Sequence, residues 1–310
     1  MITNEIIEKY TICEPVASGD FEIYPIVSSL SVSLTSLKEA ESLGTAWIQE
    51  RKVETVSTID AINNNQVGVL IPFLTQVQGG KQDRTVFEPI IVPASSGQHN
   101  PLPIPARCLE QGRWGYQVSL GRRTQRRFES SPTRVSGQMA HAFMEQKGQA
   151  DVWNQVRAAY SVPETTAYHS RSVSFVSMSR RMHESSKTMI DLEENLSEAL
   201  DIEGQVGILV SYRGQILGVE FYGASNLWKS YSKESLRGFI FDRIMLRSDI
   251  DNEQVDIRMK FIDDFYGFDL KEQDATGDGS LYHISSEDWQ GMCLVDNDVP
   301  AHLYAVRKLR

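Results

Sequence analysis

The residue types best suited to chemistry lie in two short segments, Gly79-Gly80-Lys81-Gln82-Asp83-Arg84 and Cys108-Leu109-Glu110-Gln111-Gly112-Arg113-Trp114. In the first segment the glycines allow a close backbone approach to a ligand, and Lys81 and Arg84 add positive charge. Gln82 offers both a hydrogen-bond donor and an acceptor. This set suits a phosphate or a ribose phosphate. Because neither GxxxxGK[ST] nor GxGxxG occurs, an ordinary β-turn with solvated charges is an equal alternative.

The second segment combines an acid, an amide, a guanidinium and an indole, which are Glu110, Gln111, Arg113 and Trp114. In a binding site Glu110 would accept from a ligand hydroxyl while Trp114 stacks on a base. In a structural role Glu110 would form a buried ion pair with Arg113 beside a core indole. If a reaction takes place, Glu110 is the candidate general base.

The cysteines and histidines predict neither a disulfide framework nor a metal site. Cys13, Cys108 and Cys293 are far apart and form no CxxC pair, and the six histidines form no HxH or HExxH pattern. Cys108 would be a nucleophile only if a neighbour activated it, whereas nearby Glu110 would raise the pKa of its thiol. We therefore expect Cys108 to be a small buried side chain, and we expect no cofactor.

Around these segments the chain resembles the ARPP family, the ADP-ribosylglycohydrolase- and rhodanese/phosphatase-associated protein domain, otherwise labelled a domain of unknown function. Residues 79–84 match its GAKQNR element, and Pro103 and Pro105 lead into residues 108–114, which match its Cys-x-Glu-Gln-Gly-Arg-Trp string. Two differences are Gly80 and Asp83, and Thr75-Gln76 stands where family members often carry two acids. That last difference weakens any acid-dependent reaction taken from the family.

The resemblance continues through the rest of the chain and implies one ARPP-like domain over residues 1–310, with possible lobes at 1–137 and 138–310. The matching segments are Gln149 with Val152-Trp153, Val206-Gly207 to Gly218-Val219, Leu236-Arg237, and Ala301-His302-Leu303. The family name records association with enzymes that handle ADP-ribose and phosphate esters. It implies a ligand of that class, although association alone defines no mechanism.

Charge is unevenly distributed along the chain. Its 31 basic and 41 acidic residues give a net charge of 31 − 41 = −10, with +1 over residues 1–187 and −11 over residues 188–310. Residues 107–134 contain seven arginines, no lysine and two glutamates, and guanidinium groups pair with phosphate or carboxylate through two hydrogen bonds. This arginine cluster would bind an anionic ligand, lie in solvent, or dock on the acidic C-terminal part. Nucleic acid needs a broader basic surface and is not expected.

The hydrophobic pattern predicts an α+β fold, with a β-rich N-terminal half of antiparallel strands, then helices and two C-terminal β-hairpins, packed as one compact two-lobed body. Strands are expected at 30–35, 46–53, 67–71, 86–92, 102–108, 206–212, 215–222, 281–284, 291–295 and 301–306. Helices are expected at 37–43, 138–160, 186–200, 225–246 and 253–265. Arg213-Gly214 and Asn297-Asp298 are the expected hairpin turns.

No apolar run reaches the roughly 20 residues of a membrane span, and residues 1–10 lack a signal-peptide pattern, so a cytoplasmic protein without a membrane partner is expected. The favoured function is a binding module for a nucleotide-like or phosphorylated anion of the ADP-ribose type. One alternative is a hydrolase or transferase in which Glu110 is the base and Lys81, Arg84 and Arg113 stabilise developing charge. A second alternative is a scaffold for a protein partner.

Overall fold

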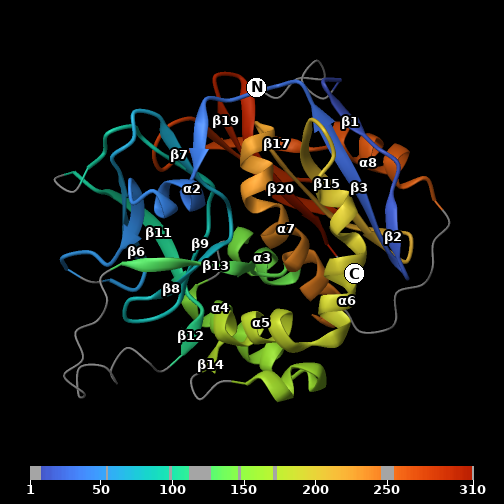
Figure 1. Ribbon diagram of the computed structural model, residues 1–310, viewed down its shortest axis with the longest axis horizontal. Coiled ribbons are helices and arrows are strands. Elements are labelled where there is room, and N and C mark those ends of the chain that lie inside the picture. Colours follow the sequence, from blue (N-terminus) through green and yellow to red (C-terminus); the bar gives the residue numbers. More distant parts are fainter. Residues whose placement is uncertain are drawn as a thin grey trace. The chain divides into compact units, whose positions relative to one another are not determined.

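The computed structural model divides into two compact units, and the first is built from both ends of the chain (Figure 1). The described residues are 8–53, 55–97, 100–111, 127–145, 148–169, 173–245 and 255–308. Unit 1 comprises Met1–Ser33, Thr188–Ala275 and Gly279–Arg310, and unit 2 comprises Leu34–Lys187 and Thr276–Asp278. The expectation of a single domain with lobes at 1–137 and 138–310 stays a prediction.

Unit 1 is organised around a nine-stranded antiparallel sheet in the order β1-β3-β15-β16-β20-β19-β18-β17, with β2 paired to β3. Its strands are β1 (Tyr10–Ile12), β2 (Val16–Ser18), β3 (Phe21–Ser28), β15 (Gln205–Tyr212), β16 (Gln215–Tyr222), β17 (Asp269–Gln273), β18 (Ser280–Ser285), β19 (Trp289–Asp296) and β20 (Val299–Arg307). Its helices are α6 (Lys187–Leu196), η2 (Ser197–Leu200), α7 (Ser225–Met245) and α8 (Ile257–Tyr266).

The two predicted hairpins are present in unit 1. Arg213 and Gly214 both have positive φ, 51° and 73°, and so do Asn297 and Asp298, at 48° and 64°. Two consecutive positive φ values produce the backbone twist that closes a two-residue hairpin. β15 therefore pairs with β16, and β19 pairs with β20.

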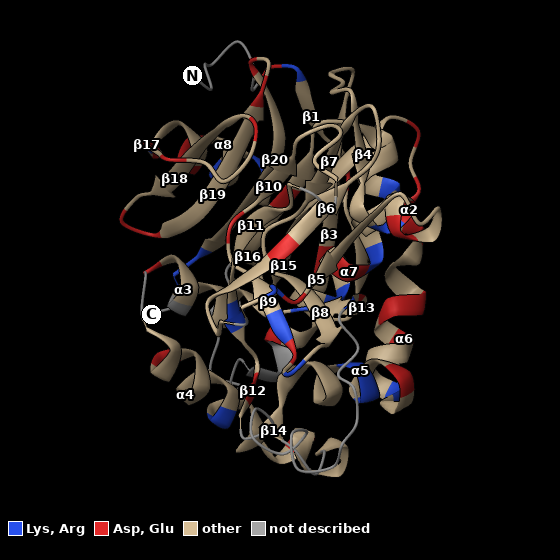
Figure 2. Ribbon diagram, turned by 90° about the vertical axis from the view of Figure 1, so that its left-hand side faces the viewer, with Lys and Arg blue, Asp and Glu red and all other residues tan. Residues whose placement is uncertain are grey.

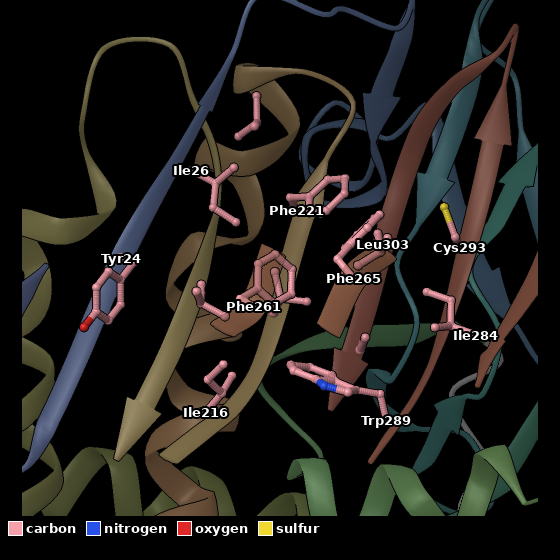
Figure 3. Close-up of a cluster of buried hydrophobic side chains, with 14 of the residues drawn as sticks. Tyr24, Ile26, Ile216, Phe221, Phe261, Phe265, Ile284, Trp289, Cys293 and Leu303 are labelled. Atoms are coloured by element: carbon pink, nitrogen blue, oxygen red, sulfur yellow. The ribbon is translucent and has the colours of Figure 1, made fainter. Parts of the chain in front are cut away.

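Successive side chains of the central strands of unit 1 point to opposite faces of the sheet, and each face packs against a different helix. Ile216 and Leu303 join the cluster that contains Phe261 and Phe265 of α8 (Figure 3). On the opposite face Tyr304 stacks on Phe239 of α7, with ring centroids 6.0 Å apart. The central strands are thus covered on both faces, in agreement with the near-continuous burial of β15 and β16.

Unit 2 contains a six-stranded sheet, β13-β8-β9-β11-β6-β5, and a three-stranded sheet, β10-β7-β4. The strands are β4 (Leu34–Ser36), β5 (Ala46–Gln49), β6 (Thr58–Asn63), β7 (Gly68–Ile71), β8 (Thr75–Gly79), β9 (Arg84–Val86), β10 (Ile90–Val92), β11 (Leu102–Cys108), β12 (Glu110–Gln111), β13 (Phe128–Arg134) and β14 (Val173–Ser174). The helices are α2 (Leu37–Ser42), α3 (Gly137–Met144), α4 (Gln149–Tyr160), η1 (Pro163–Tyr168) and α5 (Phe175–Ser185). Residues of both sheets form one core with α2.

The α+β class and the antiparallel strands are confirmed, with a strand-rich N-terminal half, helices in the middle and antiparallel strands at the C-terminal end. Three predicted strands are shorter than expected, and the one at 46–53 ends at Gln49 in β5. Of residues 30–35 only Leu34 and Thr35 join β4, and the Val32 N–H donates to the Gly223 carbonyl at 3.0 Å. The strand at 86–92 is broken before Pro89, which has no N–H to donate.

Among the described residues, no helix is both long and apolar enough to cross a membrane.

Candidate functional site

The strands of unit 2 bring the two predicted segments together. β9 lies between β8 and β11, and Arg84 is the register partner of Cys108. The Gln82 Nε2 donates to the Glu110 carbonyl at 2.9 Å, and the Asp83 N–H donates to Glu110 Oε2 at 3.2 Å. We call residues 79–84 and 108–111, together with Glu50, the loop network.

The backbone donors of this loop already bind carboxylates of the same chain. Besides the bond from Asp83 to Glu110, the Gly79 N–H donates to Asp83 Oδ1 at 3.3 Å and the Lys81 N–H donates to Glu50 Oε1 at 2.9 Å. Backbone amides in a turn form a concave anion receptor. Here the carboxylates of Asp83, Glu50 and Glu110 accept from these N–H groups.

The two glycines are required by the geometry of the turn. Gly79 and Gly80 have φ values of 108° and 52°, which other residues rarely adopt. A Cβ on Gly80 would also lie 2.5 Å from Glu50 Oε1 and 2.6 Å from Phe128 Cζ. Gly80 therefore serves the close packing of the loop against β13 and Glu50.

Arg84 belongs to the framework of the loop network. Its side chain is 0% exposed, and its Nη2 lies 3.7 Å from Glu50 Oε1. The Nη1 donates to the carbonyl oxygens of Thr55 and Val56. A buried guanidinium needs such partners because solvent does not stabilise its charge. A ligand would reach Arg84 only by displacing these contacts, and Glu110, which is 2% exposed, is similarly enclosed.

Cys108 forms three hydrogen bonds, through its Sγ, its N–H and its carbonyl oxygen. Its Sγ donates to Gln82 Oε1 at 3.0 Å, its N–H donates to Gln149 Oε1 at 2.9 Å, and its carbonyl accepts from Gln149 Nε2 at 2.8 Å. Burial raises the pKa of the Cys108 thiol to about 11, and Glu50 and Glu110 also raise it while Arg84 and Arg107 lower it. The thiol therefore remains protonated at neutral pH, which is unfavourable for a nucleophile.

Two members of this site do not stand out in the sequence. Glu50 follows β5 and binds the Lys81 N–H, although no motif marks it. Ser174 donates from Oγ to Asp83 Oδ2 at 2.6 Å and accepts from the Ser177 N–H at 3.2 Å as the N-cap of α5. The only available signal was the preference of serine for N-caps, which says nothing of a distant partner.

The rim of the loop network carries polar and basic side chains that are at least partly exposed. Lys81 and Gln111 are half-buried, and Arg157 of α4 donates from Nη1 to Gln111 Oε1 at 2.9 Å. Arg180 of α5 donates from Nη1 to Gln78 Oε1 at 3.2 Å. Figure 2 shows basic residues of α5 in blue. Lys81 and Arg157 are thus cations at residues that the sequence selected, whereas Arg180 contacts the neighbouring Gln78 and is ion-paired with Glu184 at 2.8 Å.

The arginine cluster is described only in part. Gly112, Arg113, Trp114 and the arginines at 122, 123 and 126 lie outside the described residues. Arg107 stacks over the Phe87 ring at 4.0 Å and Arg127 over the Trp47 ring at 3.8 Å, whereas Arg134 is buried. Arg107 and Arg127 thus contact two different aromatic rings.

Metal ligands do not cluster in the parts of unit 1 and unit 2 that the structure describes, where no group of three or more His, Cys, Asp or Glu side chains is placed to hold an ion. The three cysteines are free thiols, with Cys108 and Cys293 buried.

Comparison with known proteins gives one family. The family model described as the ARG and Rhodanese-Phosphatase-superfamily-associated Protein domain matches residues 9–306. No curated protein and no solved structure matches. The segments that meet in the loop network, including Gln149, are those that carry the resemblance in the sequence.

Proposed function

Because the chain belongs to the family of ARG and Rhodanese-Phosphatase-superfamily-associated Protein domains, we propose that it is a binding module for a nucleotide-like or phosphorylated anion, of the ADP-ribose type. The site is the rim of the loop network. In this proposal Gly79, Gly80, Gln82, Arg84 and Glu110 form the framework. Lys81 and Gln111 contact the ligand, together with Arg157.

The observation that carries the proposal is the position of Arg157. Its guanidinium is exposed and donates to two neutral amide oxygens, Gln111 Oε1 at 2.9 Å and Asn154 Oδ1 at 2.5 Å. Among the described residues it forms no ion pair. Because its partners are neutral, no carboxylate offsets the positive charge of this guanidinium, which can pair with an incoming anion. Its planar group of N–H donors matches the geometry of a phosphate.

A second feature supports a ligand with an aromatic base. Trp153 lies one helical turn before Arg157 on α4, and Gln149, one turn earlier, binds Cys108. The Trp153 Nε1 is buried and has no hydrogen-bond partner among the described residues. Residues four apart share a helix face, so an indole and a guanidinium lie along the same side of the site. This arrangement fits stacking on a base with a charge on its phosphate.

The hydrolase or transferase alternative has less support. Glu110 is the candidate base, yet its Oε2 accepts from the Asp83 N–H and its side chain is buried. A general base needs to lie within hydrogen-bond reach of the proton it removes. Turnover of ADP-ribose that is lost in Glu110→Gln, with binding of the nucleotide intact, would favour this alternative over the binding module.

The proposal is tested by titrating the purified protein with ADP-ribose, AMP and inorganic phosphate in a calorimeter. Replacing Arg157 with Gln removes one charged hydrogen bond, worth about 1.5–3 kcal/mol, so the Kd for ADP-ribose rises about tenfold to a hundredfold. Lys81→Ala weakens the same ligand. Lys229→Gln removes an exposed charge from α7 in unit 1 and serves as the matched control.

Two results would contradict the proposal. One is wild-type protein that binds none of the three compounds at millimolar concentration. The other is binding that Arg157→Gln and Lys81→Ala leave unchanged relative to Lys229→Gln. In the first case the scaffold alternative would be tested next, with the rim as the interface.

A further inference from the structure

Unit 1 contains an apolar pocket that the proposed anion site does not use. The pocket has a volume of about 250 Å³ and lies between β1, β3, β16 and α8. Figure 3 shows Ile26, Phe221, Phe261 and Phe265 of this region projecting from the strands and from α8. Small-molecule sites are typically concave and mostly apolar, with a few polar groups that select the ligand.

Aromatic rings dominate the lining. The rings belong to two tyrosines and three phenylalanines from three parts of the chain, which are Tyr10, Phe221, Phe261, Phe265 and Tyr266. The Tyr10 and Phe221 centroids are 4.6 Å apart, so the rings are packed as a preformed group. The face of an aromatic ring carries negative electrostatic potential and attracts cations.

The charged side chain at the pocket is also negative. Glu8 is exposed and lines the pocket, and no Lys or Arg of the described residues does so. Tyr266, another lining residue, is 52% exposed. On α8, Arg258 is ion-paired with Glu14 at 2.5 Å, and Lys260 is not among the residues that line the pocket. A carboxylate beside aromatic rings favours a positive ligand and disfavours a carboxylate or phosphate.

We propose that this pocket binds a small apolar molecule with a positively charged end, such as an aromatic or aliphatic ammonium compound. The apolar body packs against Ile26, Phe221 and Phe265, and the ammonium group lies over the ring of Tyr10 or Tyr266 within reach of Glu8. This chemistry is separate from the anion site, which lies in unit 2.

The test uses benzyltrimethylammonium as the probe, with benzyl alcohol as a neutral comparator and phenylacetate as an anionic one. Ligand-observed NMR and calorimetry on the full chain should give the lowest Kd for benzyltrimethylammonium and the highest for phenylacetate. In Glu8→Gln the Kd of the cation rises about threefold to fivefold, as expected for an exposed charge pair, and that of benzyl alcohol is unchanged. Glu198→Gln, which removes an exposed charge of unit 1, leaves all three values unchanged.

A pocket-filling variant locates the site. Ile262 lines the pocket and is only half-buried, so Ile262→Trp can fill the cavity from its open side. This variant is expected to lose the binding of all three compounds, whereas Tyr10→Phe keeps the ring and keeps the binding of the cation. Circular dichroism checks that each variant is folded. Equal Kd values for the three compounds, or binding that survives Ile262→Trp, would overturn the proposal.

Discussion

Glu41 on α2 shows how a single half-buried carboxyl group sets a pH dependence of stability. Burial raises the pKa of Glu41 to about 7, from 4.5. The folded protein therefore retains this proton over a pH range in which the unfolded chain has released it. Because the folded state then binds more protons than the unfolded state, the free energy of unfolding falls as pH rises from about 4.5 to about 7.

The first prediction follows from that sign. Glu41→Gln removes the ionisable group, so the variant is expected to be more stable than the wild type at pH 8, by about 1–3 kcal/mol. At pH 4 the difference largely disappears, because Glu41 is then protonated in both states. Urea unfolding at the two pH values measures this difference in the free energy of unfolding, and Glu198→Gln, at an exposed position, is the control. Equal effects at pH 4 and pH 8 would show that Glu41 does not titrate in this way.

At the same scale, the side chains of the loop network divide into framework and rim according to burial. Gln82, Asp83 and Arg84 are all buried and contact partners that come from distant parts of the sequence. Lys81 lies between Gly80 and Gln82 and is only half-buried. Residue type alone does not distinguish these roles, since Lys81 and Arg84 carry the same charge and are three positions apart.

At the scale of elements, the turn between β8 and β9 positions the candidate site. Its conformation depends on Gly79 and Gly80, and its N–H groups bind the carboxylates of Glu50, which follows β5, and of Glu110 in β12. Pairing of β9 with β11 then sets Glu110 beside Asp83. A change in this turn should therefore affect the stability of unit 2 before it affects any ligand.

Gly80→Ala tests the turn. The Cβ would lie within 3 Å of Glu50 and Phe128, and φ is positive, so we expect a loss of about 2–4 kcal/mol from overpacking and backbone strain together. Gly44→Ala is the matched control because Gly44 also has positive φ, at 67°, but has nothing within 4 Å of its Cβ position. Its expected cost is only the backbone part, about 1–2 kcal/mol. If the two variants lower the denaturant midpoint by the same amount, the close packing at Gly80 does not contribute to the loss of stability.

At the scale of the whole molecule, charge limits the partners that fit. The net charge is −10, and the arginines described between residues 107 and 134 are buried or stacked on aromatic rings. Nucleic acid binding depends on the neutralisation of many phosphates, and it weakens steeply with salt. A few rim cations suit a small anion better than a polyanion.

We therefore expect no binding of a fluorescent 20-base-pair duplex at 0.15 M salt in anisotropy titrations. At 50 mM salt any weak binding should show a shallow salt slope, with one or two phosphates neutralised. A slope that corresponds to six or more phosphates would contradict this expectation, and would indicate that a basic surface forms beyond the residues described.

Much of the secondary structure follows from the sequence alone. The hairpins at Arg213-Gly214 and Asn297-Asp298 and the amphipathic helix α6 depend on local periodicity and turn chemistry, which a short window of sequence contains. The segments 79–84 and 108–114 were likewise selected by residue type and by resemblance to the family. Helix α5 was not predicted, since its hydroxyl and arginine residues obscure the stripe of Phe175, Met178 and Met182.

Only the tertiary structure decided which of these residues are framework and which are rim. Strand pairing and burial depend on segments that are far apart in the chain, and Asp83 and Ser174, which are 91 positions apart, form one hydrogen bond. The partners of Arg84, the carboxylates bound by the loop and the pairing of β3 with β15 in unit 1 all depend on such long-range contacts. No local pattern encodes them, because the free energy of burial belongs to the assembled core and not to any one segment.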